Sequence, residues 1–232
     1  MMQITSIKYF THCLAWFITT RGFLFPHKNP SKNCYNTPMH HLYTTDAFVL
    51  NTSYLGEADS YITLYTKDLG LIRAKATGIR YLKSKLRFAV QPYSHIQAVL
   101  VRGKGIWRLT NAQFIEQAKA EMPEKQFLVL ARVFSLIERL VQGEEPEEKL
   151  YESILQAYSY LKNKEIREDQ LLNIECVLVL RILNHLGYIG DTKNISFFTL
   201  ENKWDNEIIS KMEEDRKDVL MEINRALRES QL

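Results

Sequence analysis

The pattern of apolar residues changes its period once along this chain, near Pro123, and that change constrains the fold most strongly. Before it, from Tyr43 to about Ala118, short runs rich in β-branched and aromatic residues predict β-strands. After it, apolar residues recur at spacings of three and four, which predicts amphipathic helices. We therefore expect an α+β fold, with a small β unit followed by a helical unit.

Five strands are expected in the first region. Their expected positions are 47–50, 61–66, 71–77, 93–101 and 106–115. The connections are short: Lys67–Gly70 reads as a turn, and Arg102–Gly105 as a glycine-punctuated hairpin tip. Five short antiparallel strands in roughly 75 residues are typical of a small closed or partly closed barrel.

Four helices are expected after Pro123. The pattern predicts them at about 127–141, 150–161, 168–186 and 205–228. The third is apolar nearly all round from Leu171 to Leu186, so we expect it at the centre of a bundle. Residues 188–204 show neither period clearly and are expected to be a loop or weak strands.

The first 38 residues differ from the rest, because they contain no Asp or Glu and hold Pro26, Pro30 and Pro38. We divide the chain into an N-terminal extension (1–38), a β domain (39–120) and a helical domain (121–232). The extension is either a functional arm or the product of a start codon assigned too early. The second interpretation, with Met39 as the initiator, is favoured.

The net charge of +3 conceals an uneven distribution of charge along the chain. Residues 1–42 carry four Lys and Arg and no acid, and residues 43–118 carry ten against five Asp and Glu. Residues 119–232 reverse the balance, with sixteen basic against twenty-two acidic residues. Such asymmetry predicts a contact between the front half and a polyanion.

Two basic clusters lie in the β region. The first is the segment Arg73–Arg87, which contains no acid and has Tyr81 and Phe88 in or beside it. The second, the hairpin cluster, consists of Arg102, Lys104 and Arg108 and adjoins Trp107. Lys and Arg neutralise phosphates, while aromatic rings stack on unpaired bases. A solvated loop whose charges serve solubility is the alternative. The candidate nucleic-acid contacts are Arg73, Lys75, Arg80, Lys83, Lys85, Arg87, Arg102, Lys104 and Arg108.

Signatures of enzymes, metals and membranes are lacking in the sequence. It contains no GxxxxGK[ST], GxSxG or HExxH motif, and Cys13, Cys34 and Cys176 do not form a CxxC pair. We predict no catalytic residue, metal site or cofactor. The cysteine usage favours a reducing, cytoplasmic setting, and no apolar run approaches the ~20 residues of a membrane span. Glu57 and Asp59 are expected to have a structural role in a turn between strands.

Several short segments together resemble the N-terminal domain of one protein family. They are Ala47–Leu50, Leu55–Asp59, Leu64–Ile72, Ala76–Arg80, Lys83–Arg87 and Gln91–Ser94. In this order and spacing they resemble the RecO family of bacterial recombination mediators, and Leu183–Tyr188 resembles the end of a helix in that family's C-terminal domain. Many members carry a four-cysteine zinc site after this point, whereas residues 189–232 contain no Cys.

The resemblance implies an N-terminal OB-fold and a helical C-terminal domain. It implies a cytoplasmic, nucleoid-associated protein of bacteria that binds single- and double-stranded DNA and anneals complementary strands. It also implies help in loading recombinase onto DNA covered by single-strand-binding protein, together with RecR. Two alternatives stay open: an OB-domain adaptor that binds an acidic protein without DNA, and an RNA-binding factor.

The partner that the resemblance implies, single-strand-binding protein, has a tail that is acidic and apolar. A receptor for it should therefore pair an apolar groove with basic residues. In the helical domain the candidates for this contact are Arg132, Arg139 and Arg181.

Overall fold

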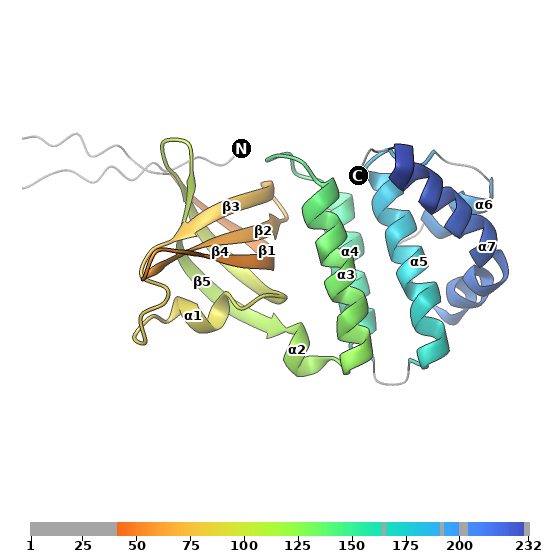
Figure 1. Ribbon diagram of the computed structural model, residues 1–232, viewed down its shortest axis with the longest axis horizontal. Coiled ribbons are helices and arrows are strands. Elements are labelled where there is room, and N and C mark those ends of the chain that lie inside the picture. Colours follow the sequence, from red (N-terminus) through yellow and green to blue (C-terminus); the bar gives the residue numbers. More distant parts are fainter. Residues whose placement is uncertain (1–40, 164–165, 191–192, 200–203, 230–232) are drawn as a thin grey trace, which may run out of the picture. The chain divides into compact units, whose positions relative to one another are not determined.

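The computed structural model describes residues 41–163, 166–190, 193–199 and 204–229. The expected N-terminal extension, residues 1–38, lies outside the described residues. Met39–Leu232 group into one compact unit by their internal contacts. Within this unit the strands come first in the chain and the longer helices follow (Figure 1).

The five expected strands form a closed barrel with the order β1-β2-β3-β5-β4. All neighbours pair antiparallel except β3 and β5, which are parallel. The expected strand positions are confirmed within two residues at each end, except for β1, which is much longer than the predicted 47–50. The strands are β1 (Leu42–Leu55), β2 (Asp59–Thr66), β3 (Gly70–Ala76), β4 (Ser94–Arg102) and β5 (Trp107–Gln117).

Strand β1 closes the barrel because it pairs along both of its edges. Its first half, Leu42–Phe48, pairs with β4, and its second half, Ala47–Leu55, pairs with β2. The register with β2 shifts between Val49 and Asn51, and such an irregularity bends a strand and increases its twist. The bend lets one strand serve two partners.

Side chains that alternate along each strand belong to two different hydrophobic cores. Val49, Ile62 and Leu64 belong to the cluster inside the barrel, together with Ile72 and Leu100. Neighbouring residues of the opposite face, Phe48 and Tyr65 among them, belong to the core shared with the helices. Successive side chains of a strand point to opposite faces, so one strand supplies both cores.

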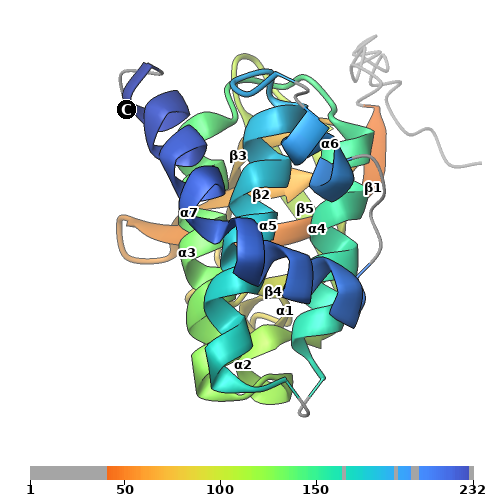
Figure 2. The same cartoon turned by 90° about the vertical axis from the view of Figure 1, so that its right-hand side faces the viewer.

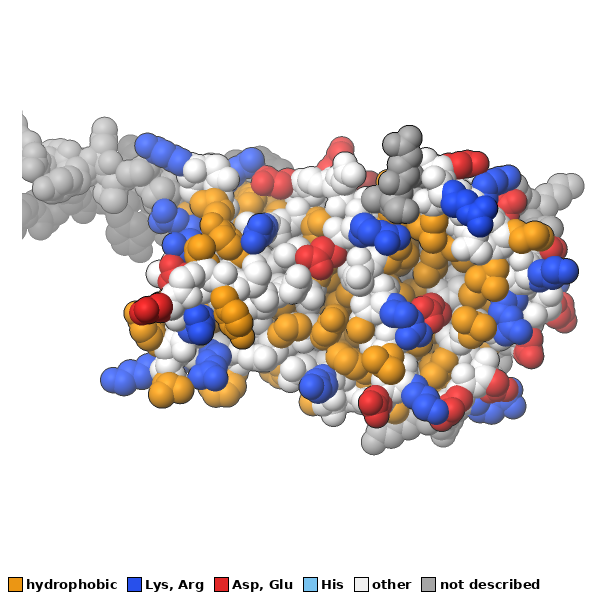
Figure 3. Space-filling view, viewed as in Figure 1, with side chains coloured by type: hydrophobic (Ala, Val, Ile, Leu, Met, Phe, Trp, Pro, Cys, Tyr) orange, Lys and Arg blue, Asp and Glu red, His pale blue; other side chains and the backbone are white. Residues whose placement is uncertain are grey.

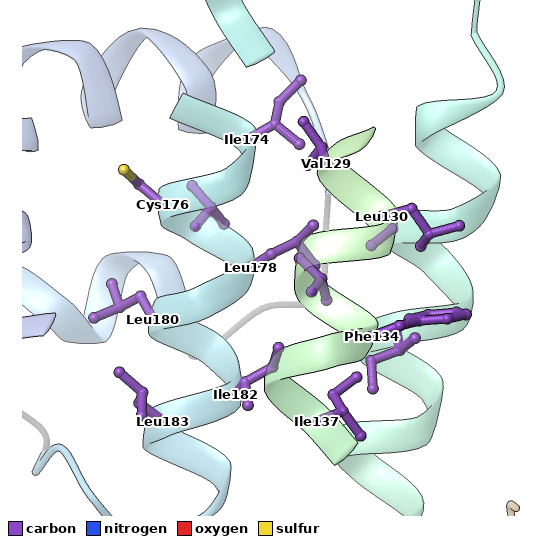
Figure 4. Packing of buried hydrophobic residues seen from close by; sticks show 14 of the residues in the cluster. Val129, Leu130, Phe134, Ile137, Ile174, Cys176, Leu178, Leu180, Ile182 and Leu183 are labelled. Atoms are coloured by element: carbon purple, nitrogen blue, oxygen red, sulfur yellow. The ribbon is translucent and has the colours of Figure 1, made fainter. Parts of the chain in front are cut away.

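The helical region has α5 at its centre, as its apolar circumference predicts. This helix contacts α3, α4, α6 and α7. Leu178 and Ile182 point toward α3, while Cys176, Leu180 and Leu183 point away from it (Figure 4). The helices are α1 (Leu86–Ala89), α2 (Ala118–Glu121), α3 (Glu124–Leu140), α4 (Glu148–Leu161), α5 (Glu168–His185), α6 (Lys193–Thr199) and α7 (Asn206–Glu229).

The expectation of a loop or weak strands over residues 188–204 is wrong for its middle part, which forms α6. Ile195 and Phe198 are buried in the core shared with the other helices. Their spacing of three residues places both on one face of α6, and α6 lies beside α5 (Figure 2). Tertiary packing thus stabilises a helix that the local sequence pattern does not predict. None of the helices in the described ranges is long and apolar enough to cross a membrane.

Aromatic side chains join the barrel to the helices. Phe48 stacks on His95 with ring centroids 4.7 Å apart, and its ring lies 5.3 Å from Phe134 and 5.4 Å from Tyr158. The turn after β2 also packs closely against the segment between α3 and α4. A Cβ atom on Gly70 would lie 2.3 Å from the Glu145 carbonyl oxygen, so this approach requires glycine.

His95 stands in a buried polar cluster at this junction. Its Nε2 lies 3.2 Å from the Tyr151 hydroxyl and its Nδ1 lies 3.8 Å from Glu116, which binds Lys162 at 2.5 Å. Burial lowers the pKa of His95 from its ordinary value of 6.5, and the nearby Glu116 only partly opposes this. The ring is therefore neutral in the folded protein near pH 7.

We expect the free energy of unfolding to fall as the pH drops below 6.5, where the unfolded chain protonates His95 before the folded chain does. The stability contribution is complete above pH 6.5 and is lost progressively toward the lowered pKa. His95→Gln should flatten this dependence, whereas His41→Gln, at an exposed site, should leave it unchanged. Urea unfolding between pH 5 and pH 8 measures it. If the free energy of unfolding depended on pH equally in both variants, the assignment of this dependence to His95 would be contradicted.

Candidate nucleic-acid interface

The face formed by β2 and β3 carries the first two predicted cations. Arg73 and Lys75 point outward, because the alternate residues of β3 point into the barrel core. The Arg73 guanidinium lies 4.4 Å from the centre of the Tyr61 ring and donates a hydrogen bond to Ser53 at 3.3 Å. Stacking of a guanidinium on an aromatic ring holds it in place while leaving donors available.

Asp59 links this face to the loop that follows β3. Lys75 Nζ lies 2.8 Å from one carboxylate oxygen, and the Gly78 backbone N–H donates to the other at 2.8 Å. The Lys75 hydrogen bond, followed by that of Gly78, lowers the pKa of Asp59. The expected turn role of Asp59 is confirmed, and Lys75 already has an acidic partner.

Arg80 fastens the same loop to the turn between β1 and β2. Its backbone N–H donates to the Ala58 carbonyl at 3.0 Å, and its guanidinium donates to the Gly56 carbonyl at 2.7 Å. The guanidinium also lies 4.6 Å from the centre of the Tyr54 ring. A second arginine is thus held against a tyrosine on the barrel surface.

The remainder of the loop, residues 81–92, exposes both cations and apolar side chains. Lys83, Lys85 and Arg87 are exposed, and none makes a side-chain hydrogen bond or ion pair with any residue that the structure describes. Tyr81 and Phe88 are 64% and 74% exposed, unusually high for large apolar side chains. Unpaired cations beside exposed aromatic rings suit a strand with a charged backbone and flat bases.

The hairpin cluster divides into one paired cation and two unpaired ones. Arg102 lies 3.1 Å from Glu144 and 5.3 Å from the centre of the Trp107 ring. Lys104 and Arg108 are exposed and have no side-chain partner among the described residues. Arg108 is paired with Lys75 in the parallel register of β3 and β5, so it lies beside the β2–β3 face.

Acidic residues are few on this side of the barrel. Asp46 and Asp68 both contribute to raising the pKa of Tyr151 on α4, and Glu116 lies beside His95, so these three acids are near the helices. In Figure 3, Lys and Arg side chains are more frequent than acids over the barrel, and both signs are mixed over the helices.

A cleft of about 540 Å³ opens beside the Arg80–Tyr54 pair. Strands β1 and β2 contribute Thr52, Tyr54 and Ser60 to its lining, and the segment between β3 and β4 contributes Arg80 and Arg87. Sequence reasoning missed Tyr54 and Tyr61 as members of this surface. Their pairing with arginines depends on strand register and loop path, for which the sequence carries no direct signal.

The three candidate partner contacts in the helical region differ in accessibility. Arg132 is exposed and binds both carboxylate oxygens of Glu175 at 2.6 Å, and Arg139 is exposed as well. Arg181 is fully buried: it donates to the Phe198 carbonyl at 2.8 Å and stacks on Trp204. Arg181 is therefore corrected to a core residue, because its guanidinium does not reach a docking surface.

Arg132 borders a shallow groove between α3 and α5. The groove has a volume of about 230 Å³ and contains Leu128 and Leu172, which are each about half exposed. Lys125 also lines it. Within the described ranges, no three His, Cys, Asp or Glu side chains come together as a group that could hold a metal ion.

A five-stranded closed barrel with this strand order, followed by helices, defines an OB-fold protein with a helical C-terminal part. Residues 39–118 match the family model described as "Recombination protein O N terminal". Over these residues the chain is similar to the N-terminal domain of RecO proteins.

Three curated relatives are each named DNA repair protein RecO. The protein of Heliobacterium modesticaldum is 32% identical over 148 residues, which cover 63% of this chain and 52% of the relative. The protein of Thermoanaerobacter sp. is 27% identical over 168 residues, covering 68% and 66%. The protein of Caldanaerobacter subterraneus is 24% identical over 170 residues, covering 67% and 66%. The chain thus spans between half and two thirds of the length of these relatives.

The double role of Asp59 leads to a prediction about the loop. Asp59→Ala removes the acceptor for Gly78 and the partner of Lys75, so the Gly78 and Arg80 amides should exchange hydrogen several-fold faster. Glu57→Ala, which removes an exposed carboxylate two residues away, should leave both amides unchanged. Hydrogen–deuterium exchange read by NMR or mass spectrometry measures this. Unchanged exchange in Asp59→Ala would show that the loop is held by other contacts.

Proposed function

We propose that this protein is a DNA-binding mediator of recombinational DNA repair that acts without a catalytic residue. Five exposed cations without an acidic partner among the described residues carry this proposal, because they share the barrel surface with exposed aromatic rings. They are Lys83, Lys85, Arg87, Lys104 and Arg108. The names of the curated relatives, all DNA repair proteins, support the same role.

Several cations of the barrel lie where OB-folds bind nucleic acids, which is the face of strands 2 and 3 and the loops that join strands 1 and 2 and strands 4 and 5. Arg73 and Lys75 lie on that face, and Lys104 lies on the loop between β4 and β5. Phosphates of either single- or double-stranded DNA would contact the cations. Exposed rings such as Phe88 would stack on bases where these are unpaired.

Annealing follows from the same surface without further chemistry. Two complementary strands repel each other through their phosphates, and a cationic surface that neutralises part of this charge lowers the repulsion. Recombinase loading on DNA covered by single-strand-binding protein, in cooperation with RecR, is the cellular role that we propose for this activity.

We assign the groove between α3 and α5 to the tail of single-strand-binding protein. Leu128 and Leu172 offer apolar contacts, and Lys125 and Arg132 border them with positive charge. This combination complements a peptide that is both acidic and apolar. Arg132 is already bound to Glu175 and Lys125 to Glu168, so a tail carboxylate would compete with these acids.

The salt dependence of DNA binding tests the barrel surface. If roughly five phosphates of a single strand are neutralised, a plot of log affinity against log salt should have a slope of about −3.5. Replacing Lys83, Lys85 and Arg87 together by Gln removes three of these contacts, so the slope should fall to about −1.4. Fluorescence anisotropy with a labelled oligonucleotide, across a salt series, measures both values.

A matched control replaces Lys149, Lys217 and Arg228, three exposed cations of the helical region, by Gln. This variant changes net charge equally and should keep the slope of the unaltered protein. A slope near zero for the unaltered protein would overturn the proposal. Stronger binding to acidic peptides than to DNA would favour an adaptor, and a preference for RNA over matched DNA would favour an RNA-binding factor.

The groove is tested separately with a labelled acidic peptide that ends in apolar residues. Leu128→Ser combined with Leu172→Ser should weaken its binding roughly ten-fold, because apolar contact area is lost. Met221→Ser, at an exposed site on α7, should not affect it. Equal peptide affinity in both variants would remove the groove from consideration and leave DNA binding by the barrel untouched.

A further inference from the structure

The cleft beside Tyr54 has the size and lining of a ligand site. Its volume of about 540 Å³ falls in the usual range of small-molecule pockets, about 300–1,000 Å³. Ile79 and Val90 line it and are almost completely buried, so they form an apolar floor. Thr52 and Ser60 add hydroxyl groups to the lining.

The entrance of the cleft combines a flat ring with positive charge. Tyr54 is 77% exposed even though the Arg80 guanidinium lies 4.6 Å from its ring centre. The Arg80 side chain is oriented by its bond to the Gly56 carbonyl, so the ring and the guanidinium form a fixed pair. Arg87 lines the same cleft and has no acidic partner among the described residues.

We propose that this cleft binds one unpaired nucleotide of a DNA strand. The base would stack against the Tyr54–Arg80 pair over the apolar floor, and the adjoining phosphate would contact Arg87. This inference rests on the proposed DNA binding and deepens it, because it assigns one part of the surface to a base and not to the backbone. A base within an intact duplex is stacked and paired, so it enters only after extrusion, which costs a few kcal/mol.

The consequence is a preference for DNA with an unpaired base. Stacking of a base on an aromatic side chain contributes about 1–3 kcal/mol. A cleft for one base should therefore increase affinity roughly ten-fold for a duplex that has a single unpaired base. Contacts to phosphates alone would not distinguish such a duplex from one that lacks the base, because the charge is the same.

Three labelled duplexes test this: one fully paired, one with a single bulged adenosine, and one with a bulged abasic residue of equal charge. The unaltered protein should bind the adenosine bulge roughly ten-fold more tightly than the abasic bulge. Tyr54→Ala removes the ring and Gln91→Trp fills the cleft from its exposed rim. Both variants should bind the two bulged duplexes with equal affinity. Phe114→Ala, a ring exposed outside the cleft, should keep the ten-fold difference.

The outcomes separate this inference from the proposed function. Equal affinity of the unaltered protein for all three duplexes, with strong salt dependence, would overturn the base site and leave DNA binding intact. Absence of binding to every duplex at low salt would overturn both. Binding of free deoxyadenosine monophosphate as tight as that of the bulged duplex would also overturn the inference, because the cleft would then be a site for a small nucleotide.

Discussion

Strand β1 carries the constraint on which the rest of the structure depends, because it pairs with β4 along its first half and with β2 along its second. This double pairing closes the barrel and fixes which side chains point inward. Val49 then belongs to the barrel core, while Phe48 belongs to the core shared with the helices. One face of the barrel is thereby covered by α3 and α4, and the β2–β3 face remains available to a ligand.

The same arrangement sorts the charges of the barrel. Asp46, Asp68 and Glu116 lie near the covered side, where Glu116 binds Lys162 and approaches His95. Asp59, on the other side of the barrel, forms an ion pair with Lys75. The excess positive charge of residues 43–118 is therefore concentrated away from the helices. A net charge of only +3 for the whole chain is compatible with a strongly cationic local field.

Much of this could be predicted from the sequence, because short-range patterns determine it. Alternation located the strands, and the lack of acids from Arg73 to Arg87 located the charged surface. The stacking of Arg73 on Tyr61 could not be predicted, because it depends on cross-strand register. The burial of Arg181 could not be predicted either, since a helix that is apolar nearly all round gives no sign of which of its polar residues the neighbouring helices enclose. The helix at 193–199 was missed because it depends on tertiary packing.

Two groups of cations on the barrel have different physical roles. Arg73 and Arg80 are held on tyrosine rings by stacking and by hydrogen bonds, so their geometry is set before any ligand binds. Lys83, Lys85 and Arg87 lack such partners among the described residues, so a phosphate displaces no ion pair when it binds them. Preorganised groups lower the ordering cost of a specific contact, whereas unpaired cations contribute affinity that depends on salt and not on sequence. Under the function proposed above, binding to many DNA sequences would rely on the unpaired cations, and the preorganised arginines would serve where an unpaired base is distinguished.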